Sequence, residues 1–279
     1  MKKNAIIRIV LYVVLILVLG GLLVAALSGF GPGPVIHTSA PADAQEHSEV
    51  RFPAGASFTD FDIEWASGTI RFVLSDTDSL TVTETGGEEL PMVTYVDEDT
   101  LHIQFSRSFP AFRRTHKDLT VSVPAGWPVG DISIGSADSD VEIEGLEFRE
   151  LDLDGASNRA VLTGCIADEV SLDGASNRLE FEGILRSQLE SDGASNRCTL
   201  RLQEQIAEID LDGVSSSLEL YRPDHNFTVD SDGLSISVES DFPFTRSGDL
   251  YTYLGAPDPT VTRISVEGVS SRIQIYRAN

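Results

Sequence analysis

The chain has 279 residues, of which 41% are apolar, and its formal net charge is −24. This length allows one or two folded domains with a packed core. The strong negative charge excludes nucleic acid as a partner and repels anionic lipid headgroups. Two cysteines are too few for a disulfide framework, and the five histidines are scattered without the spacing of zinc ligands.

The N-terminus carries the pattern of a membrane anchor. Ile9–Leu27 is almost continuously apolar, and Lys2, Lys3 and Arg8 precede it. At about 1.5 Å per residue, such a helix approaches the ~30 Å thickness of the hydrocarbon core. The basic flank should stay in the cytoplasm. We therefore predict a signal-anchor helix within residues 1–30. The alternative is a cleaved signal peptide, whose apolar region usually has about 7–15 residues.

A short linker is expected to follow the anchor. Residues 31–48 are dominated by Gly, Pro, Ala and Ser and show no apolar period. This composition is typical of a flexible or semi-extended stalk. The remaining residues, 49–279, are expected to form one extracytoplasmic domain, so the predicted location is the plasma membrane with a single pass.

One hexapeptide, Asp-Gly-Ala-Ser-Asn-Arg, occurs three times in the middle of the chain. The copies are Asp154–Arg159, Asp173–Arg178 and Asp192–Arg197, each starting 19 residues after the last. Degenerate copies begin at Asp212 and Asp232. Self-similarity with a period near 20 is typical of a chain that stacks one supersecondary unit on itself.

The residues around each repeated Asp alternate between apolar and polar. Leu151, Asp152 and Leu153 precede the first copy, and Ala160 and Leu162 follow it. This alternation predicts strands with one buried face. We therefore predict an all-β fold, a single-handed parallel β-solenoid with about 19–20 residues per coil. Its layers should lie about 4.8 Å apart.

Three more layers fit the same register. They are centred on Glu64, Gly135 and Glu267, where the apolar positions persist although the hexapeptide is lost. The longer segment Asp241–Thr260 is predicted to form a hairpin or a protruding loop. The last layer, Ile264–Tyr276, runs nearly to the C-terminus, so it is expected to be an open strand edge through which the protein self-associates.

Within each repeat, the Asp-Gly pair should turn a corner, because Gly tolerates positive φ. The strand phase then predicts that Ala156, Ala175 and Ala194 face inward. The same phase places a column of asparagines in the interior, and stacked amides can hydrogen-bond along it. This structural ladder consists of Asn158, Asn177 and Asn196.

The next position of the repeat faces outward and carries Arg159, Arg178 and Arg197. A row of arginines would suit an anionic polymer, so these residues are candidate ligand-binding residues. The alternative is a charge-balanced solvated face, because Glu180 and other carboxylates lie close by. The second candidate contact surface is formed by Tyr251 and Tyr253, which lie in the segment Asp241–Thr260.

No metal or cofactor is predicted. A column of Asp residues would attract calcium, but the Gly-Gly-x-Gly-x-Asp nonapeptide of calcium-binding β-rolls is missing. Cys165 and Cys198 fall two layers apart, roughly 9.6 Å along the axis. This is beyond the reach of a disulfide, so two separate thiols are expected.

The order of elements resembles a known family. The resemblance rests on the N-terminal anchor, the segment Trp65–Thr69, a strand that ends in Val123-Pro124, the strand–Gly–strand repeats, and Tyr251–Gly255 before a closing coil. The chain is similar to the bacterial putative-adhesin family of β-strand repeats and to membrane-anchored LiaG-like envelope proteins. The resemblance covers about residues 49–279 and implies no catalytic residues.

These observations lead to a functional expectation. Motifs of a nucleophile elbow, a phosphate-binding loop or a zinc protease do not occur in the sequence. We expect a non-enzymatic, adhesin-like interaction or scaffold module of the cell envelope, with a protein or glycan partner. The alternatives are a polysaccharide-active β-helix enzyme and an envelope-stress or sensory component that acts through a membrane partner.

Overall fold

The computed structural model describes residues 35–37, 40–41, 44–86, 90–110 and 116–278. Every regular element among them is a β-strand. Within these ranges, no helix is long and apolar enough to cross a membrane. The predicted transmembrane segment, Ile9–Leu27, lies outside the described residues.

Two strands belong to a separate compact unit. β1 (Val35–His37) and β8 (Ser108–Pro110) pair antiparallel in a sheet of their own. All other described strands form one large sheet system. In that system β2 (Gln45–His47) pairs antiparallel with β6 (Met92–Asp97). The end of the predicted stalk is therefore already part of the sheet, because it pairs with the edge of β6. Arg107 also donates a hydrogen bond to the Ala44 carbonyl, just before β2 (2.6 Å).

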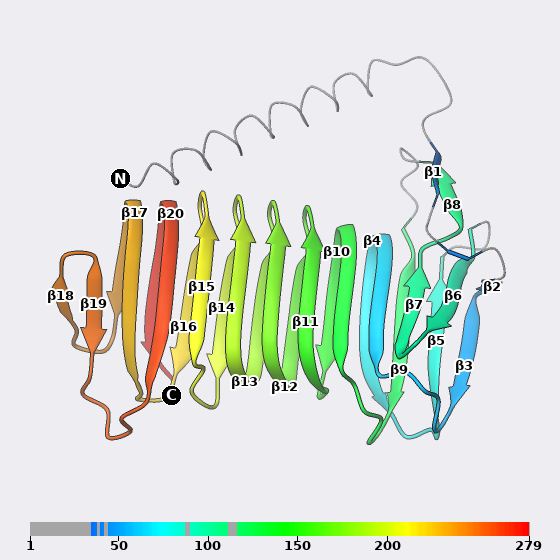
Figure 1. The fold of residues 1–279 in the computed structure, drawn as a ribbon, viewed down its shortest axis with the longest axis horizontal. Helices are drawn as coiled ribbons and strands as arrows, with labels where there is room; N and C mark the ends of the chain where they lie inside the picture. Colours follow the sequence, from blue (N-terminus) through cyan, green and yellow to red (C-terminus); the bar gives the residue numbers. More distant parts are fainter. Residues whose placement is uncertain (1–34, 38–39, 42–43, 87–89, 111–115, 279) are drawn as a thin grey trace, which may run out of the picture. The chain divides into compact units, whose positions relative to one another are not determined.

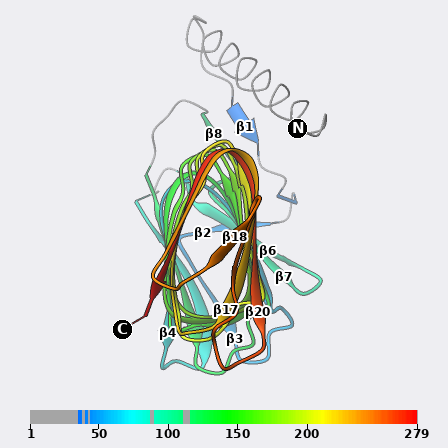
Figure 2. The ribbon, with the colours of Figure 1, turned by 90° about the vertical axis from the view of Figure 1, so that its left-hand side faces the viewer.

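The main body is a stack of parallel strand layers around one core (Figures 1 and 2). Arg159 pairs with Arg178, and Arg178 with Arg197, so each layer repeats the register of the one before. This confirms the predicted all-β, solenoid-like architecture. The strands of the stack are β10 (Asp131–Glu144), β11 (Glu147–Gly155), β12 (Arg159–Gly174), β13 (Arg178–Gly193), β14 (Arg197–Leu202), β15 (Glu208–Gly213), β16 (Ser217–Arg222), β17 (Asn226–Ser240) and β20 (Val261–Arg277).

The N-terminal strands extend this stack and then close it. They are β3 (Glu49–Pro53), β4 (Asp60–Ser75), β5 (Ser79–Thr85), β6, β7 (Thr100–Gln104) and β9 (Asp118–Pro124). β4 pairs in parallel with β10 on one side, and with β7 and β9 on the other. Antiparallel pairs then follow, β6 on β7 and β5 on β9. The layers predicted around Glu64 and Gly135 are confirmed, with Glu64 directly opposite Gly135.

The layer order departs from the chain order at the C-terminal end. β20 pairs with β15 and β16 on one side and with β17 on the other, so it lies inside the stack (Figure 1). The expectation that Ile264–Tyr276 forms an open terminal edge is therefore wrong. Every layer pairs through the same main-chain groups, so β20 can be inserted between β17 and the layer of β15 and β16, although it comes after them in the sequence. β17 is instead the outermost layer, and β18 (Thr245–Ser247) and β19 (Leu250–Tyr253) form the predicted hairpin beside it.

The Asp-Gly corners hold the layers at close distance. Gly155, Gly174 and Gly193 have φ of 152°, 129° and 146°. A Cβ atom on Gly174 would stand 1.7 Å from the Gly155 carbonyl oxygen, so only glycine fits. The turn carries the next residue outward, and Ala156 and Ala175 are exposed. The prediction that these alanines face inward is wrong, because the strand phase resumes only after the corner, at the asparagine.

Apolar side chains from both strands of each layer fill the interior. Leu179, Phe181 and Leu189 of β13 are at most 1% exposed. Cys165 and Cys198 are both buried and both free thiols, as predicted. Burial raises the pKa of Cys198 to about 12, so Cys198 packs as a small apolar residue.

A buried lysine ties the N-terminal strands together. Lys117 precedes β9 and is fully buried. Its Nζ pairs with the Glu84 carboxylate and donates to the Leu90 and Phe105 carbonyl oxygens (2.7 and 2.5 Å). The Lys117 carbonyl in turn accepts from the Trp65 indole (3.0 Å). Burial lowers the pKa of Lys117 and raises that of Glu84, and their contact opposes both shifts.

Candidate functional site

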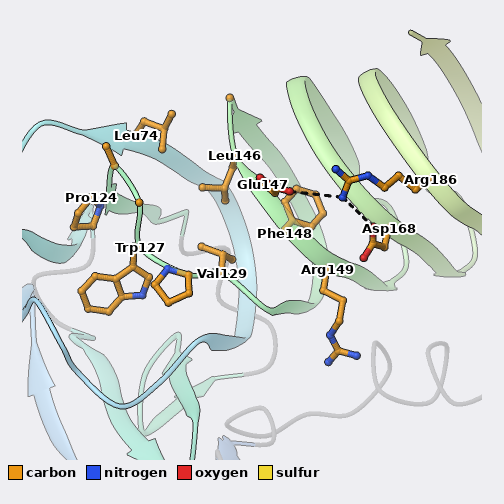
Figure 3. A pocket seen from close by; sticks show the side chains of 14 residues that line it. Leu74, Pro124, Trp127, Val129, Leu146, Glu147, Phe148, Arg149, Asp168 and Arg186 are labelled. Atoms are coloured by element: carbon orange, nitrogen blue, oxygen red, sulfur yellow. Dashed lines mark hydrogen bonds and ion pairs between the residues drawn. The ribbon is translucent and has the colours of Figure 1, made fainter. Parts of the chain in front are cut away.

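The repeat is interrupted between β9 and β10, and a groove opens at this interruption. Its volume is about 610 Å³, within the usual range of ligand pockets. Figure 3 shows the loop with Pro124, Trp127 and Val129 on one side, and the start of β11 with the neighbouring parts of β12 and β13 on the other. The apolar surface comes from Leu74, Pro124, Trp127, Pro128, Val129, Leu146 and Phe148.

Trp127 is held in this groove by a tight turn. Gly126 has a φ of 83°, and the Trp127 N–H donates to the Pro124 carbonyl (3.0 Å). The indole ring packs against Phe58, with 5.6 Å between ring centroids. One part of the indole is thus fixed on the core while the side chain remains half-buried. Leu74, at 52% exposure, adds an accessible apolar contact to the same groove.

Charged side chains from three successive strands form the rim. Arg186 of β13 pairs with Asp168 of β12 (3.3 Å) and with Glu147 of β11 (3.6 Å). Arg149 pairs with Asp131 at the start of β10. Burial raises the pKa of Asp131, and the charge of Arg149 opposes this shift. The side chains of Arg149 and Arg186 are 61% and 49% exposed, so both retain donors for a ligand.

This arrangement combines a fixed aromatic surface with planar hydrogen-bonding groups. An apolar face of a ligand can lie on Trp127 and Leu74, while its polar groups reach Arg149, Arg186 and Asp168. Sequence reasoning missed this site, because Trp127 is a lone aromatic in a Gly/Pro-rich segment. The one available signal was that residues 124–130 break the repeat.

The arginine row lies on the outer face, as the strand phase predicts. Arg159, Arg178 and Arg197 are exposed and stand in adjacent layers. Glu180 pairs with both Arg159 and Arg178 at 3.1 Å, which partly neutralises the row. The inserted β20 places Arg272 opposite Ser217, two layers beyond Arg197, and sequence reasoning missed this fourth arginine.

The second predicted contact surface is wrong. Tyr251 and Tyr253 are only 5% and 7% exposed, because β19 folds back on β17 and turns them inward. Tyr253 packs against Phe242, with 5.2 Å between ring centroids, and donates to Asp224 (2.8 Å). Arg246 lies over the Tyr251 ring at 4.9 Å. These tyrosines help to close the end of the core.

The predicted interior asparagines are each 2% exposed and form a hydrogen-bonded column. The Asn158 N–H donates to the Asn177 amide oxygen, and the Asn177 N–H to that of Asn196, both at 3.0 Å. The Asn177 and Asn196 Nδ2 groups donate to main-chain carbonyls of their own layers (2.8 Å). The bonds along the column therefore join the main-chain N–H of one asparagine to the side-chain amide of the next. The sequence had suggested bonds between side-chain amides.

The repeated aspartates also stand in register. Asp154 lies opposite Asp173, and Asp173 opposite Asp192. In the described part of the chain, no three His, Cys, Asp or Glu residues gather closely enough to hold a metal ion. The repeated aspartates therefore mark the corners of successive layers, and the described residues around them do not form a metal-binding cluster.

Comparison with known proteins gives a family and three likenesses in solved structures. A cell adhesion protein of Clostridium sporogenes, described as putative, has 9% identity and a TM-score of 0.35, covering 84% of this chain and 100% of that one. A putative adhesin of Parabacteroides merdae has 9% identity and a TM-score of 0.37, covering 83% and 96%. A putative adhesin of Bacteroides fragilis has 12% identity and a TM-score of 0.32, covering 89% and 100%.

No curated protein matches the sequence. The family model of Toastrack DUF4097 matches residues 58–240, which span most of the sheet system from β4 to β17. The match includes the three hexapeptide layers and the loop that carries Trp127. The chain therefore belongs to the Toastrack DUF4097 family.

Proposed function

We propose that the protein is a non-enzymatic, adhesin-like interaction module of the bacterial envelope that binds a glycan in the Trp127 groove. The observation that carries the proposal is the groove itself, where an aromatic ring and a charged rim meet at the interruption of the repeat. The proposal includes a single membrane pass through Ile9–Leu27 and an extracytoplasmic stack of 19–20-residue coils. The apolar pattern of that segment and the basic flank before it support this part.

A glycan fits the chemistry of the groove better than an apolar ligand does. The apolar face of a sugar ring can lie against Trp127, and its hydroxyls can pair with the guanidinium and carboxylate groups of the rim. Arg186 already bridges Glu147 and Asp168, so this part of the rim offers donors and acceptors side by side. A neutral or weakly acidic saccharide can accept hydrogen bonds from the donors of the rim and donate to its acceptors.

The test is binding of the full chain, purified in mild detergent, to immobilised bacterial envelope polysaccharides. We expect Trp127→Ala and Leu74→Ser to weaken binding at least tenfold. Leu74 is half exposed, so its replacement should leave the melting temperature nearly unchanged. Leu254→Ser is the matched control, because Leu254 is also a largely exposed leucine (65%) and lies outside the groove.

A further variant separates the groove from the arginine row. Replacing Arg159, Arg178 and Arg197 together by Gln should leave binding intact if the groove holds the ligand. Loss of binding in this variant, with Trp127→Ala unaffected, would assign the ligand to the row. Absence of binding to every polysaccharide tested would overturn the glycan proposal.

A further inference from the structure

The outermost layer, β17, has one edge that is only half covered. β19 pairs with Phe227–Asp230 in the first half of the strand. In the second half, from Ser235 to Ser240, β17 pairs with β20 on one side. No other strand in the described part of the chain pairs with its opposite side. The main-chain groups on that side form an open edge, to which another strand can add.

The open edge has a defined polarity. The Asp241 N–H donates inward to the Ile275 carbonyl of β20 (3.0 Å). Successive residues of a strand direct their main-chain groups to opposite sides, so the even-numbered residues direct theirs outward. Ile236 and Val238 occupy inward-facing positions yet are only half-buried, and Leu234, at the corner position of Ala156, is 65% exposed. The edge is therefore both unpaired and apolar on its inner face.

This edge is complementary to itself. In an antiparallel pair centred on Ile236, Ile236 meets Ile236 of a second copy, and Leu234 meets Val238. The residues with outward main-chain groups then face one another, as hydrogen-bonded pairs require. On the outer face Ser235 meets Ser237. Glu239 falls opposite Gly233, so no carboxylate directly faces another across the junction.

We propose that two copies of the chain associate through β17, by antiparallel pairing centred on Ile236. The interface is isologous, as expected for a two-fold dimer. The hairpin of β18 and β19 borders the open edge on each copy and limits the pairing to Asp232–Ser240. The net charge of −24 opposes association, so the dimer should tighten as salt screens the repulsion.

The test uses the full chain in mild detergent, with the protein mass measured by sedimentation equilibrium. The unmodified chain should approach twice its mass of 30.2 kDa as its concentration rises. The double variant Ser235→Glu/Ser237→Glu places like charges opposite one another and should remain monomeric. The variant Ser235→Lys/Ser237→Lys should also remain monomeric, and an equal mixture of the two should restore the dimer.

A matched control is Ser217→Glu, because Ser217 is an outward-facing serine on β16, which is paired on both sides. It should dimerise like the unmodified chain. Circular dichroism will show whether each variant keeps its strands. A monomeric unmodified chain at every concentration and salt level would overturn the proposal. So would a Glu variant that still dimerises, because the contact would then lie elsewhere in the chain.

Discussion

In the layers from Asp154 to Gly213, the buried asparagines form a column in which the main-chain N–H of one layer donates to the side-chain amide of the next. Asn158 and Asn177 show this, because the main chain of each donates to the amide of the next. Among the N-terminal strands, Lys117 instead gathers partners from separate segments, including Glu84 and the Phe105 carbonyl. A column spreads its stability over many equivalent bonds, whereas the Lys117 cluster concentrates it in one residue.

The largest expected effect follows from removing the buried charge of Lys117. Lys117→Met leaves the 5%-exposed Glu84 without its charge partner and should reduce the free energy of unfolding by roughly 3–5 kcal/mol. Denaturant unfolding of the full chain measures this loss. The double variant Lys117→Met/Glu84→Leu should recover most of it, because no unpaired charge remains. A loss below about 1 kcal/mol in the single variant would contradict the concentrated stability of this region.

The second prediction tests the close approach of the layers at their corners. Gly174→Ala introduces a Cβ 1.7 Å from a carbonyl oxygen at positive φ. We expect a loss of roughly 3 kcal/mol, the upper range for strained backbone. Gly55→Ala is the matched control, since Gly55 also has positive φ but nothing within 4 Å. Equal losses in the two variants would show that φ alone matters and that layer spacing does not.

A third pair of variants tests the asparagine column in both directions. Asn177→Ala deprives the buried Asn158 N–H of its acceptor and should lose about 1–3 kcal/mol. The column weakens at Ser216, whose Oγ has no hydrogen-bond partner within the described residues. Ser216→Asn should extend the column to the Asn196 N–H and gain about 1 kcal/mol. Thermal unfolding of the two variants should therefore shift in opposite directions, and a destabilised Ser216→Asn would refute the extension.

The smallest expected effect is a pH dependence within the repeats. Burial first, and then the charges of Asp154 and Asp173, raise the pKa of Asp152 above its usual 3.8. The folded state thus binds this proton more tightly than the unfolded state does. The stabilisation is present below about pH 3.8 and is lost as pH rises through the folded pKa. Asp152→Asn should therefore raise the melting temperature at pH 7 and flatten its pH dependence.

Exposed Asp76 provides the control for this experiment, because Asp76→Asn lies outside the repeats. It should leave the pH dependence as it is in the unmodified chain. High salt should narrow the difference between Asp152→Asn and the unmodified chain, because repulsion between stacked carboxylates is screened. A difference that is unaffected by salt would point to burial alone as the cause.

Periodicity let the sequence determine the layers themselves. The 19-residue spacing determined the register of the layers, and the alternation around Asp154 determined which strand residues are buried. The Asp-Gly pair located the corner, although the inward placement of Ala156 was wrong. The positive φ of Gly155 changes which of the following residues face the core. The alternation of apolar and polar residues along a strand gives no information about this change.

Only the tertiary structure decided what happens where the repeat ends. Every layer offers the same main-chain groups, so the pattern of β20 fits several positions, and its insertion beside β17 depends on which edges are open. The same is true of Tyr251 and Tyr253, which look like a loop surface in sequence but are buried because β19 folds back. The groove at Trp127 arises from residues far apart in the chain, such as Leu74 and Arg186. Local periodicity determines a layer, but contacts between distant segments determine how the stack is closed and where it can bind.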